Sequence, residues 1–139
     1  MGNFQANWLI HVRIRKAIET DLPAMEWNGE YAHFRHMFAQ AYSQARQGTT
    51  VIWIMEIPGI GCIGQAIVQL TCSRPELADG FHRAYLYGFR IKPKYRGQGL
   101  GKQVIDHIES DLLKRNFRIL TLNVAKNNRR AQSFYRECG

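Results

Sequence analysis

The residues of this chain whose types and spacing could do chemistry lie in one short stretch, residues 89–102 (FRIKPKYRGQGLGK). Three glycines spaced by two follow a β-prone run and stand at the start of a helical pattern. The first turn of a helix carries unpaired N–H groups and the positive end of the helix dipole, and glycines let phosphate oxygens approach this backbone closely. Four cations surround the same point, namely Lys92, Lys94, Arg96 and Lys102. The stretch therefore predicts a phosphate-binding turn, and a tight turn beside a solvated basic face is the alternative.

Two common phosphate-binding patterns do not fit this stretch. The dinucleotide pattern G-x-G-x-x-G fails because the glycines are spaced by two and no acidic residue follows at the usual distance. The nucleotide P-loop fails because Gln103 follows Lys102, and because Arg96 occupies the position of the first glycine. The spacing thus disfavours NAD and ATP as ligands.

The pattern that does fit resembles the GNAT superfamily of N-acetyltransferases. Their acetyl-CoA motif, Arg/Gln-x-x-Gly-x-Gly/Ala after a strand, corresponds here to Arg96, Gly99 and Gly101. A second match, residues 128–135 in the pattern N-x-x-A-x-x-F-Y, follows the strand-like run ILTLNV at the expected distance. The resemblance covers residues 80–139 by specific motifs and the N-terminal half by the order of its elements.

The resemblance implies direct transfer of an acetyl group from acetyl-CoA to an amine, without a metal and without a covalent enzyme intermediate. Backbone groups of residues 89–91 would bind the pantetheine arm, and one N–H there would stabilise the oxyanion. Tyr135 would be the catalytic acid that protonates the leaving thiolate. The cofactor-binding residues that it implies are Phe89, Arg90, Ile91, Arg96, Gly97, Gln98, Gly99, Leu100, Gly101, Lys102 and Asn128.

The general base is not determined by the sequence. An amine with a pKa of about 10.4 is neutral in roughly one molecule in 2,500 at pH 7, which costs about 4.6 kcal/mol. Asn123 stands where one branch of the family, the ribosomal-protein N-terminal acetyltransferases, has Glu. Glu30 near the helices on the acceptor side, or a water chain past Tyr85 or Tyr87, remain as alternatives.

The acceptor stays open among a small amine, an antibiotic, a peptide N-terminus and a protein lysine. A pocket rim of Trp27, Tyr31, Tyr85 and Tyr87 would favour a small or aromatic-contacting acceptor. The rival function is a non-catalytic regulatory protein of the same fold that binds CoA or nucleic acid. CoA release with a panel of amines, compared with a salt-sensitive shift by DNA or RNA, separates the two.

The elements that must position these residues follow from apolar periodicity. The order β-α-α-β-β-β-α-β-α predicts a mixed α/β sheet with a late parallel crossover, which by resemblance is the GNAT acyl-CoA N-acyltransferase fold. Strict alternation would place Tyr85, Tyr87, Phe89 and Ile91 on one face of a strand. We expect strands at 11–15, 50–57, 62–71, 83–91 and 118–124. One helix is expected to begin at 20–23, and three more are expected to cover 30–46, 97–116 and 128–138.

Length and composition fit one domain over residues 1–139. The 139 residues carry 19 Lys+Arg against 11 Asp+Glu, a net charge of +8 that favours anionic partners. Three cysteines without paired spacing predict reduced thiols and a cytoplasmic protein, and no apolar run predicts a membrane helix. Family members continue with further strands, so we expect a truncated chain, or a second copy in a homodimer that covers the sheet edge.

Two residue groups outside the motifs have ordinary explanations. His33 and His36 lie three apart on a predicted helix but lack a supporting metal-ligand pattern, so surface histidines are favoured over a metal site. Three arginines of the last predicted segment favour a solvated face or the CoA 3′-phosphate over nucleic acid, namely Arg129, Arg130 and Arg136.

Overall fold

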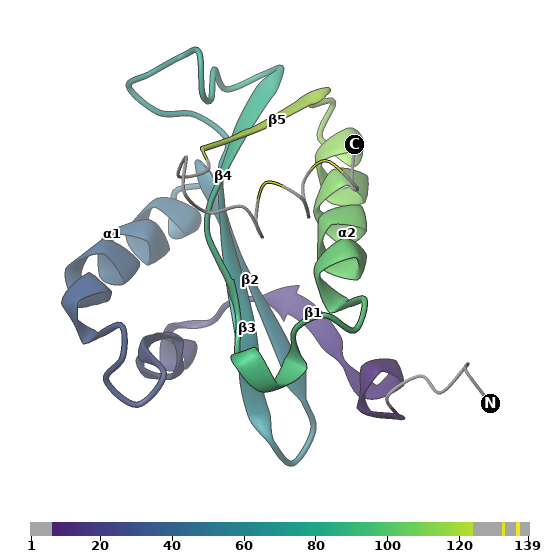
Figure 1. Ribbon diagram of the computed structural model, residues 1–139. Coiled ribbons are helices and arrows are strands. Elements are labelled where there is room, and N and C mark those ends of the chain that lie inside the picture. Colours follow the sequence, from purple (N-terminus) through teal and green to yellow (C-terminus); the bar gives the residue numbers. More distant parts are fainter. Residues whose placement is uncertain (1–6, 124–131, 133–135, 137–139) are drawn as a thin grey trace.

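The computed structural model describes residues 7–123, 132 and 136, and these form a five-stranded sheet with helices on both faces (Figure 1). The strands follow chain order across the sheet, and neighbours are antiparallel from the first strand to the fourth. The last pair is parallel, as the β-α-β pattern predicts. The mixed α/β sheet expected from the sequence is confirmed. Its strands are β1 (Arg13–Lys16), β2 (Thr50–Ile57), β3 (Gly61–Gln69), β4 (Arg83–Ile91) and β5 (Ile119–Leu122).

One α-helix covers each face of the sheet. Figure 1 shows α1 (Arg35–Arg46) on one face and α2 (Leu100–Lys114) on the other. A 3-10 helix at the N-terminus, η1 (Asn7–His11), packs on the α2 side, and η5 (Pro93–Tyr95) connects β4 to α2. The chain between β1 and α1 forms three more 3-10 helices, which are η2 (Glu19–Asp21), η3 (Pro23–Glu26) and η4 (Ala32–Phe34).

The helix expected from residues 20–23 is wrong, and the helix expected at 30–46 begins only at Arg35. Trp27, Asn28 and Gly29 take φ values of 50°, 58° and 100° in succession, and left-handed residues end any right-handed helix. The segment turns back over the sheet instead. The expected helix at 128–138 lies outside the described residues except for Gln132 and Arg136.

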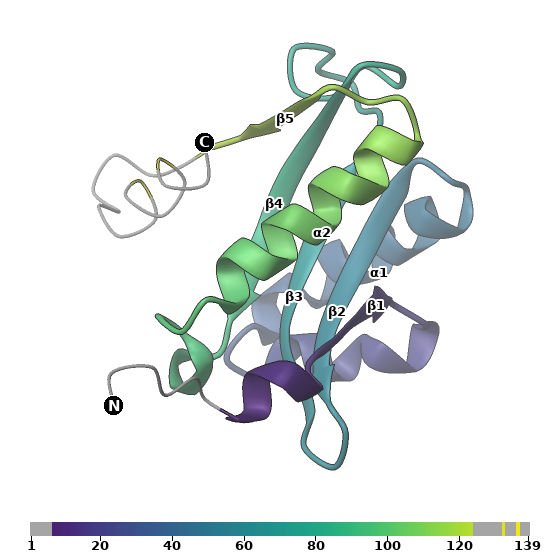
Figure 2. The ribbon, with the colours of Figure 1, turned by 90° about the vertical axis from the view of Figure 1, so that its right-hand side faces the viewer.

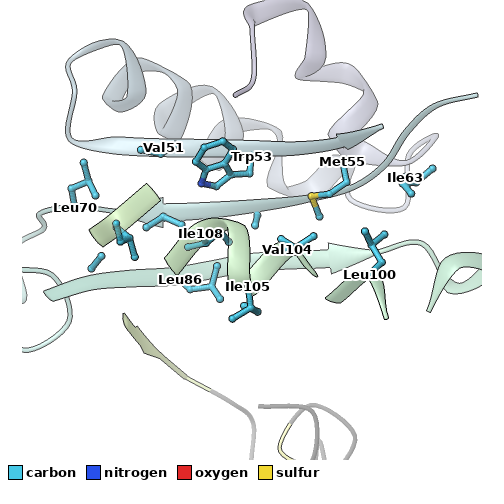
Figure 3. Packing of buried hydrophobic residues seen from close by; sticks show 14 of the residues in the cluster. Val51, Trp53, Met55, Ile63, Leu70, Leu86, Leu100, Val104, Ile105 and Ile108 are labelled. Carbon is cyan, nitrogen blue, oxygen red and sulfur yellow. The ribbon is translucent and has the colours of Figure 1, made fainter. Parts of the chain in front are cut away.

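Two apolar layers hold the helices on the sheet. The smaller layer lies under α1 and includes Phe38 from the helix and Ile54 from β2. The larger layer fills the space between the sheet and α2 (Figure 3). Burial of each such side chain contributes about 1.5–3 kcal/mol, so this layer fixes the start of α2 against the sheet. Its labelled members are Val51, Trp53, Met55, Ile63, Leu70, Leu86, Leu100, Val104, Ile105 and Ile108.

A β-bulge interrupts β4 at Gly88. Gln65 and Ile67 of β3 pair with Arg90 and Tyr87, so β4 has one residue more than its partner over this interval. Gly88 has a φ of 60°, which glycine adopts without strain. The expectation that Tyr85, Tyr87, Phe89 and Ile91 share one face is therefore wrong: Tyr87 packs on the α1 side, whereas Phe89 and Ile91 pack on the α2 side.

The two parallel strands pair only along the first four residues of β4. β4 and β5 pair from Arg83 with Ile119 to Leu86 with Leu122. β5 ends at Leu122, but β4 continues through the bulge to Ile91. Figure 2 shows β5 leading away from the lower part of β4. The bulge thus lies where the sheet opens, next to the start of α2.

Candidate functional site

The turn before α2 exposes main-chain amides. Gly97 and Gly99 take φ values of 72° and 97°, and α2 begins at Leu100, later than the expected position 97. No side chain of the described residues caps this helix, and its first turn has no acidic residue. A Cβ atom on Gly97 would meet nothing within 4 Å. The turn therefore offers donors, positive potential and open space to an anion.

The four basic residues predicted around this turn are close to it but differ in their contacts. Arg96 donates a hydrogen bond from Nε to the carbonyl oxygen of Ile91 (2.6 Å), which ties the turn to the end of β4. Lys102 lies 3.4 Å from Asp106 in an exposed ion pair, which contributes little to stability. Lys94 is exposed and lies over the ring of Tyr95 (5.8 Å to the centroid). Lys102 and Lys94 can therefore turn toward an anion without breaking a buried contact.

The N-terminal 3-10 helix braces the turn, a feature that the sequence analysis missed. The indole N–H of Trp8 donates to Oε1 of Gln98 (3.2 Å), and the side-chain amide of Gln98 donates to the carbonyl oxygen of Lys94 (3.2 Å). The Trp8 ring also packs edge-on against Tyr95, with centroids 5.0 Å apart. A single tryptophan far away in sequence carries no pattern that could have announced this contact.

An open groove of about 260 Å³ lies on the opposite face of the sheet, between α1 and strands β3 and β4. Tyr85 and Tyr87 form one wall, with stacked rings whose centroids are 5.6 Å apart. The side-chain amide of Asn123 donates to the Tyr85 hydroxyl (3.4 Å), which connects the groove to the end of β5. The other lining residues carry no charge, and they are Met37, Gln40, Ala41, Gln44 and Gln69.

Tyr87 of this groove acts as a neutral phenol. Burial, and secondarily the neighbouring Tyr85, raise the pKa of Tyr87 to about 12. At neutral pH its hydroxyl therefore stays protonated, which suits it to donate a hydrogen bond rather than to take a proton. None of the described residues that line the groove is a carboxylate.

Two of the four residues predicted for a pocket rim line this groove, Tyr85 and Tyr87. Tyr31 is not among its described lining residues, and Trp27 is wrong as a rim residue because it is only 6% exposed. Its indole N–H donates to Oε1 of Gln65 (3.0 Å), and the Gln65 amide donates to the carbonyl oxygen of Met25 (3.2 Å). Trp27 thus belongs to a buried polar contact that the sequence analysis also missed. Glu30, an alternative base, lies exposed in the turn before η4.

The structure brings most of the predicted site residues together at the open end of the sheet. Phe89, Arg90 and Ile91 follow the bulge, and the predicted anion-binding residues Arg96, Gly97, Gln98, Gly99, Leu100, Gly101 and Lys102 lie directly beyond them. Asn128 and the proposed acid Tyr135 lie outside the described residues. No group of three metal-ligating side chains occurs among the described residues, His33 and His36 included.

Two further properties concern one cysteine and the helices. Burial raises the pKa of the Cys62 thiol, so this cysteine is not an activated nucleophile. None of the helices in the described part of the chain has the length and apolar character that a membrane-spanning helix requires.

A family profile and several solved structures match this chain. The sequence profile of the Acetyltransferase (GNAT) family matches residues 14–139. The structure of AAC(6')-Iy with the bisubstrate analogue CoA-S-monomethyl-acetylneamine has a TM-score of 0.73 at 20% identity, covering 93% of this chain and 90% of that chain. A transcriptional regulator from Bacillus halodurans C-125 has a TM-score of 0.73 at 23% identity, covering 93% and 92%.

Glucosamine-6-phosphate N-acetyltransferase from Arabidopsis thaliana has a TM-score of 0.66 at 17% identity, covering 92% of this chain and 90% of that chain. No curated protein matches the sequence. At these identities the solved structures show a shared fold, whereas the profile match covers most of the chain and shows the family.

Proposed function

This chain belongs to the GNAT acetyltransferase family, and from that premise we propose that it moves the acetyl group of acetyl-CoA directly to an amine acceptor. The amine nitrogen attacks the thioester carbonyl, the C–N bond forms, and the C–S bond breaks to release the CoA thiolate. The observation that carries this proposal is the uncapped glycine turn at the start of α2 beside the separating strands β4 and β5.

The pyrophosphate is proposed to bind at residues 97–102. The open space at Gly97, the amides of the first turn and the exposed Lys94 and Lys102 support this position. A diphosphate there would take hydrogen bonds from main-chain N–H groups and lie at the positive end of the α2 dipole. Arg96 would support it indirectly, because its Nε already holds the carbonyl of Ile91.

The pantetheine arm is proposed to run along Phe89, Arg90 and Ile91, where β4 continues after β5 has separated from it. The bulge at Gly88 changes the direction of the main-chain groups at this point, which is one way for a strand to aim an N–H at a developing oxyanion. Such a donor stabilises the tetrahedral state more than the ground-state carbonyl, so it lowers the barrier.

Two roles in the proposal come from the family resemblance alone. Asn128 would contact the pantetheine arm, and Tyr135 would protonate the thiolate as it leaves. Deprotonation of the acceptor is proposed to proceed through water in the groove past Tyr85 and Tyr87, because Tyr87 stays protonated and no carboxylate lines the described part of this groove.

The experiment that tests the proposal compares Gly97→Glu with Gly59→Glu. Both glycines have positive φ values, 72° and 85°, and open space for a Cβ atom, but Gly59 lies in the distant β2–β3 turn. The strain of the two substitutions is therefore matched. Gly97→Glu should weaken acetyl-CoA binding at least about a hundredfold, since it places a carboxylate in the phosphate position.

Isothermal titration with acetyl-CoA measures the affinity, and detection of the free CoA thiol with a panel of amines measures turnover. Equal affinity of the two variants would show that CoA binds elsewhere. Tyr135→Phe should bind acetyl-CoA normally but release CoA more slowly, and full turnover by this variant would remove Tyr135 from the acid role.

The second candidate is a regulatory protein of this fold that binds CoA or nucleic acid without catalysis. The net charge of +8 favours it, and one structural neighbour is named a transcriptional regulator. Binding of acetyl-CoA with no CoA release for any amine, together with salt-dependent binding of DNA or RNA, would support this candidate instead.

A further inference from the structure

The side chain of Arg90 lies on the groove side of the sheet, not on the side of α2. The bulge at Gly88 turns it there, because Phe89 and Ile91 on either side of it pack on the α2 layer. Its guanidinium carbon lies 4.5 Å from the centroid of the Tyr31 ring and 4.9 Å from that of Phe34. Arg90 therefore follows Tyr87 along the same face of β4, at the end of the groove next to the bulge.

No anion balances this guanidinium among the described residues. Its side chain takes part in none of the hydrogen bonds or ion pairs found in the described part of the chain, and its Nη1 atom is buried without a partner. Glu26, whose main-chain carbonyl accepts from the N–H of Tyr31, has its carboxylate occupied, because Arg35 donates two hydrogen bonds of 2.9 Å to it. A half-buried charge with an unsatisfied donor is costly, so its presence here calls for a partner.

The aromatic contacts do not supply that partner. The rings of Tyr31 and Phe34 attract the flat face of the guanidinium, and they leave its N–H groups, which lie in the plane, without acceptors. The two ring contacts restrict where the guanidinium can lie. An arginine with its N–H groups free of other partners is suited to a planar, two-oxygen anion.

The groove is uncharged along its described lining, in contrast to the guanidinium of Arg90. Its described lining residues carry no charge, so they offer no ion pair to an acceptor, whereas Arg90 lies farther along β4, beyond the bulge. Met37 of the groove lies about one helical turn after Phe34. Tyr87 of the groove lies three residues before Arg90. The guanidinium and the groove thus follow one another along the same face of β4.

We propose that Arg90 is a specificity-determining residue that binds an anionic oxygen group, a carboxylate or a phosphate, on the amine acceptor. The acceptor is then an amino acid, an acidic peptide end or a phosphorylated amine, and a polyamine is disfavoured by repulsion. This inference rests on the proposed acetyl transfer, and it assigns the substrate class of the same site.

The test compares kcat/KM for paired amines that differ by one anionic group. Tyrosine is compared with tyramine for the carboxylate, phosphoethanolamine with ethanolamine for the phosphate, and spermidine serves as the polycation. The wild-type protein should prefer at least one anionic member over its neutral counterpart by roughly tenfold to a hundredfold, the range expected for a hydrogen-bonded charge. The pair that shows the larger ratio identifies the anion.

Three variants separate recognition from a structural role. Arg90→Met should reduce the anionic-to-neutral ratio to about one, and Arg90→Lys should retain part of it because the charge remains without the fork. Arg118→Met is the matched control: it removes one positive charge from an exposed residue just before β5, and it should retain the wild-type ratio. Melting curves identify any variant that fails to fold, and Arg90→Lys keeps the test valid in that case.

A binding measurement keeps this inference apart from the proposed function. The anionic amine should raise the melting temperature of the wild-type protein more than its neutral counterpart does, and Arg90→Met should lose this difference. If acetyl-CoA neither binds nor reacts, acetyl transfer is refuted, while the difference in melting temperature still supports the anion site. Equal ratios and equal melting shifts for all pairs, or ratios unaffected by Arg90→Met, overturn the assignment of Arg90.

Discussion

The sheet face under α2 is apolar, whereas the face under α1 carries a buried glutamine, two stacked tyrosines and an arginine that has no counterion among the described residues. On the α2 side, recognition is proposed to use main-chain amides at the start of a helix, which packing holds in place. On the α1 side, side chains line an open groove. Recognition by main-chain groups needs a rigid scaffold and depends little on which side chains are present. Selectivity for one acceptor, in contrast, needs particular side chains.

The largest expected effect is on the free energy of unfolding, which substitutions on the two faces of the sheet should lower by different amounts. Ile108→Ala should lower the free energy of unfolding by about 3–4 kcal/mol, because Ile108 is fully buried and its removal leaves a cavity under α2. Met37→Ala, on the half-buried groove face, should lower it by about 1 kcal/mol. Urea unfolding of both variants measures the difference. Equal losses would show that the groove face is as tightly packed as the α2 face.

A smaller effect is expected from the contact between Trp8 and the turn that is proposed to bind CoA. Trp8→Phe keeps an aromatic ring against Tyr95 but loses the hydrogen bond to Gln98. Since an exposed hydrogen bond is worth about 0.5–1.5 kcal/mol, acetyl-CoA affinity should fall roughly twofold to tenfold. Titration calorimetry measures the affinity, and a melting curve of the free variant checks that it is folded at the temperature of the titration. An unaltered affinity would mean that the turn is rigid without its N-terminal neighbour.

The smallest effect should appear in acid, at the end of the sheet where β4 and β5 still pair. Burial opposes ionisation of Asp79, but N–H groups of Arg83, His82 and Phe81 donate to its carboxylate and lower its pKa to about 2. A lowered pKa in the folded state gives stability above the ordinary value of 3.8, which is lost as the pH falls toward 2.

Asp79→Asn retains an acceptor oxygen but cannot titrate. Melting temperatures measured from pH 5 to pH 2 should therefore fall less steeply for this variant than for the wild-type protein. Parallel curves would show that other carboxylates set the acid limit, among them Asp21 and Glu56. Arg15 lowers the pKa of both by hydrogen bonds.

Much of the scaffold was predictable because local signals are strong where the chain alternates or turns. Strands at 50–57 and 83–91 have the predicted bounds, and Gly48 and Gly59 take left-handed conformations, which glycine favours at a helix end and in a hairpin turn. The glycine turn before α2 was identified for the same reason. Its backbone conformation depends on residues within a few positions of one another.

Other features depend on contacts between residues far apart in sequence. Trp27 is an aromatic residue of the kind predicted at the pocket rim, but its hydrogen bond to Gln65 places it in the interior. The 3-10 helices before α1 and the brace from Trp8 to Gln98 likewise follow from packing across the sheet. No local period encodes such contacts, so pattern analysis assigned these residues to other roles.

The amino-acid sequence by itself determined the order of the strands and of the two long helices, the position of the glycine turn before α2 and the family, because alternation, glycines and cations act over short distances. Only the tertiary structure decided which face each residue of β4 serves. One extra residue relative to β3 reverses the alternation at Gly88, and so Arg90 reaches the groove instead of the core under α2. Register between strands is a property of their pairing, and it cannot be read from either strand alone.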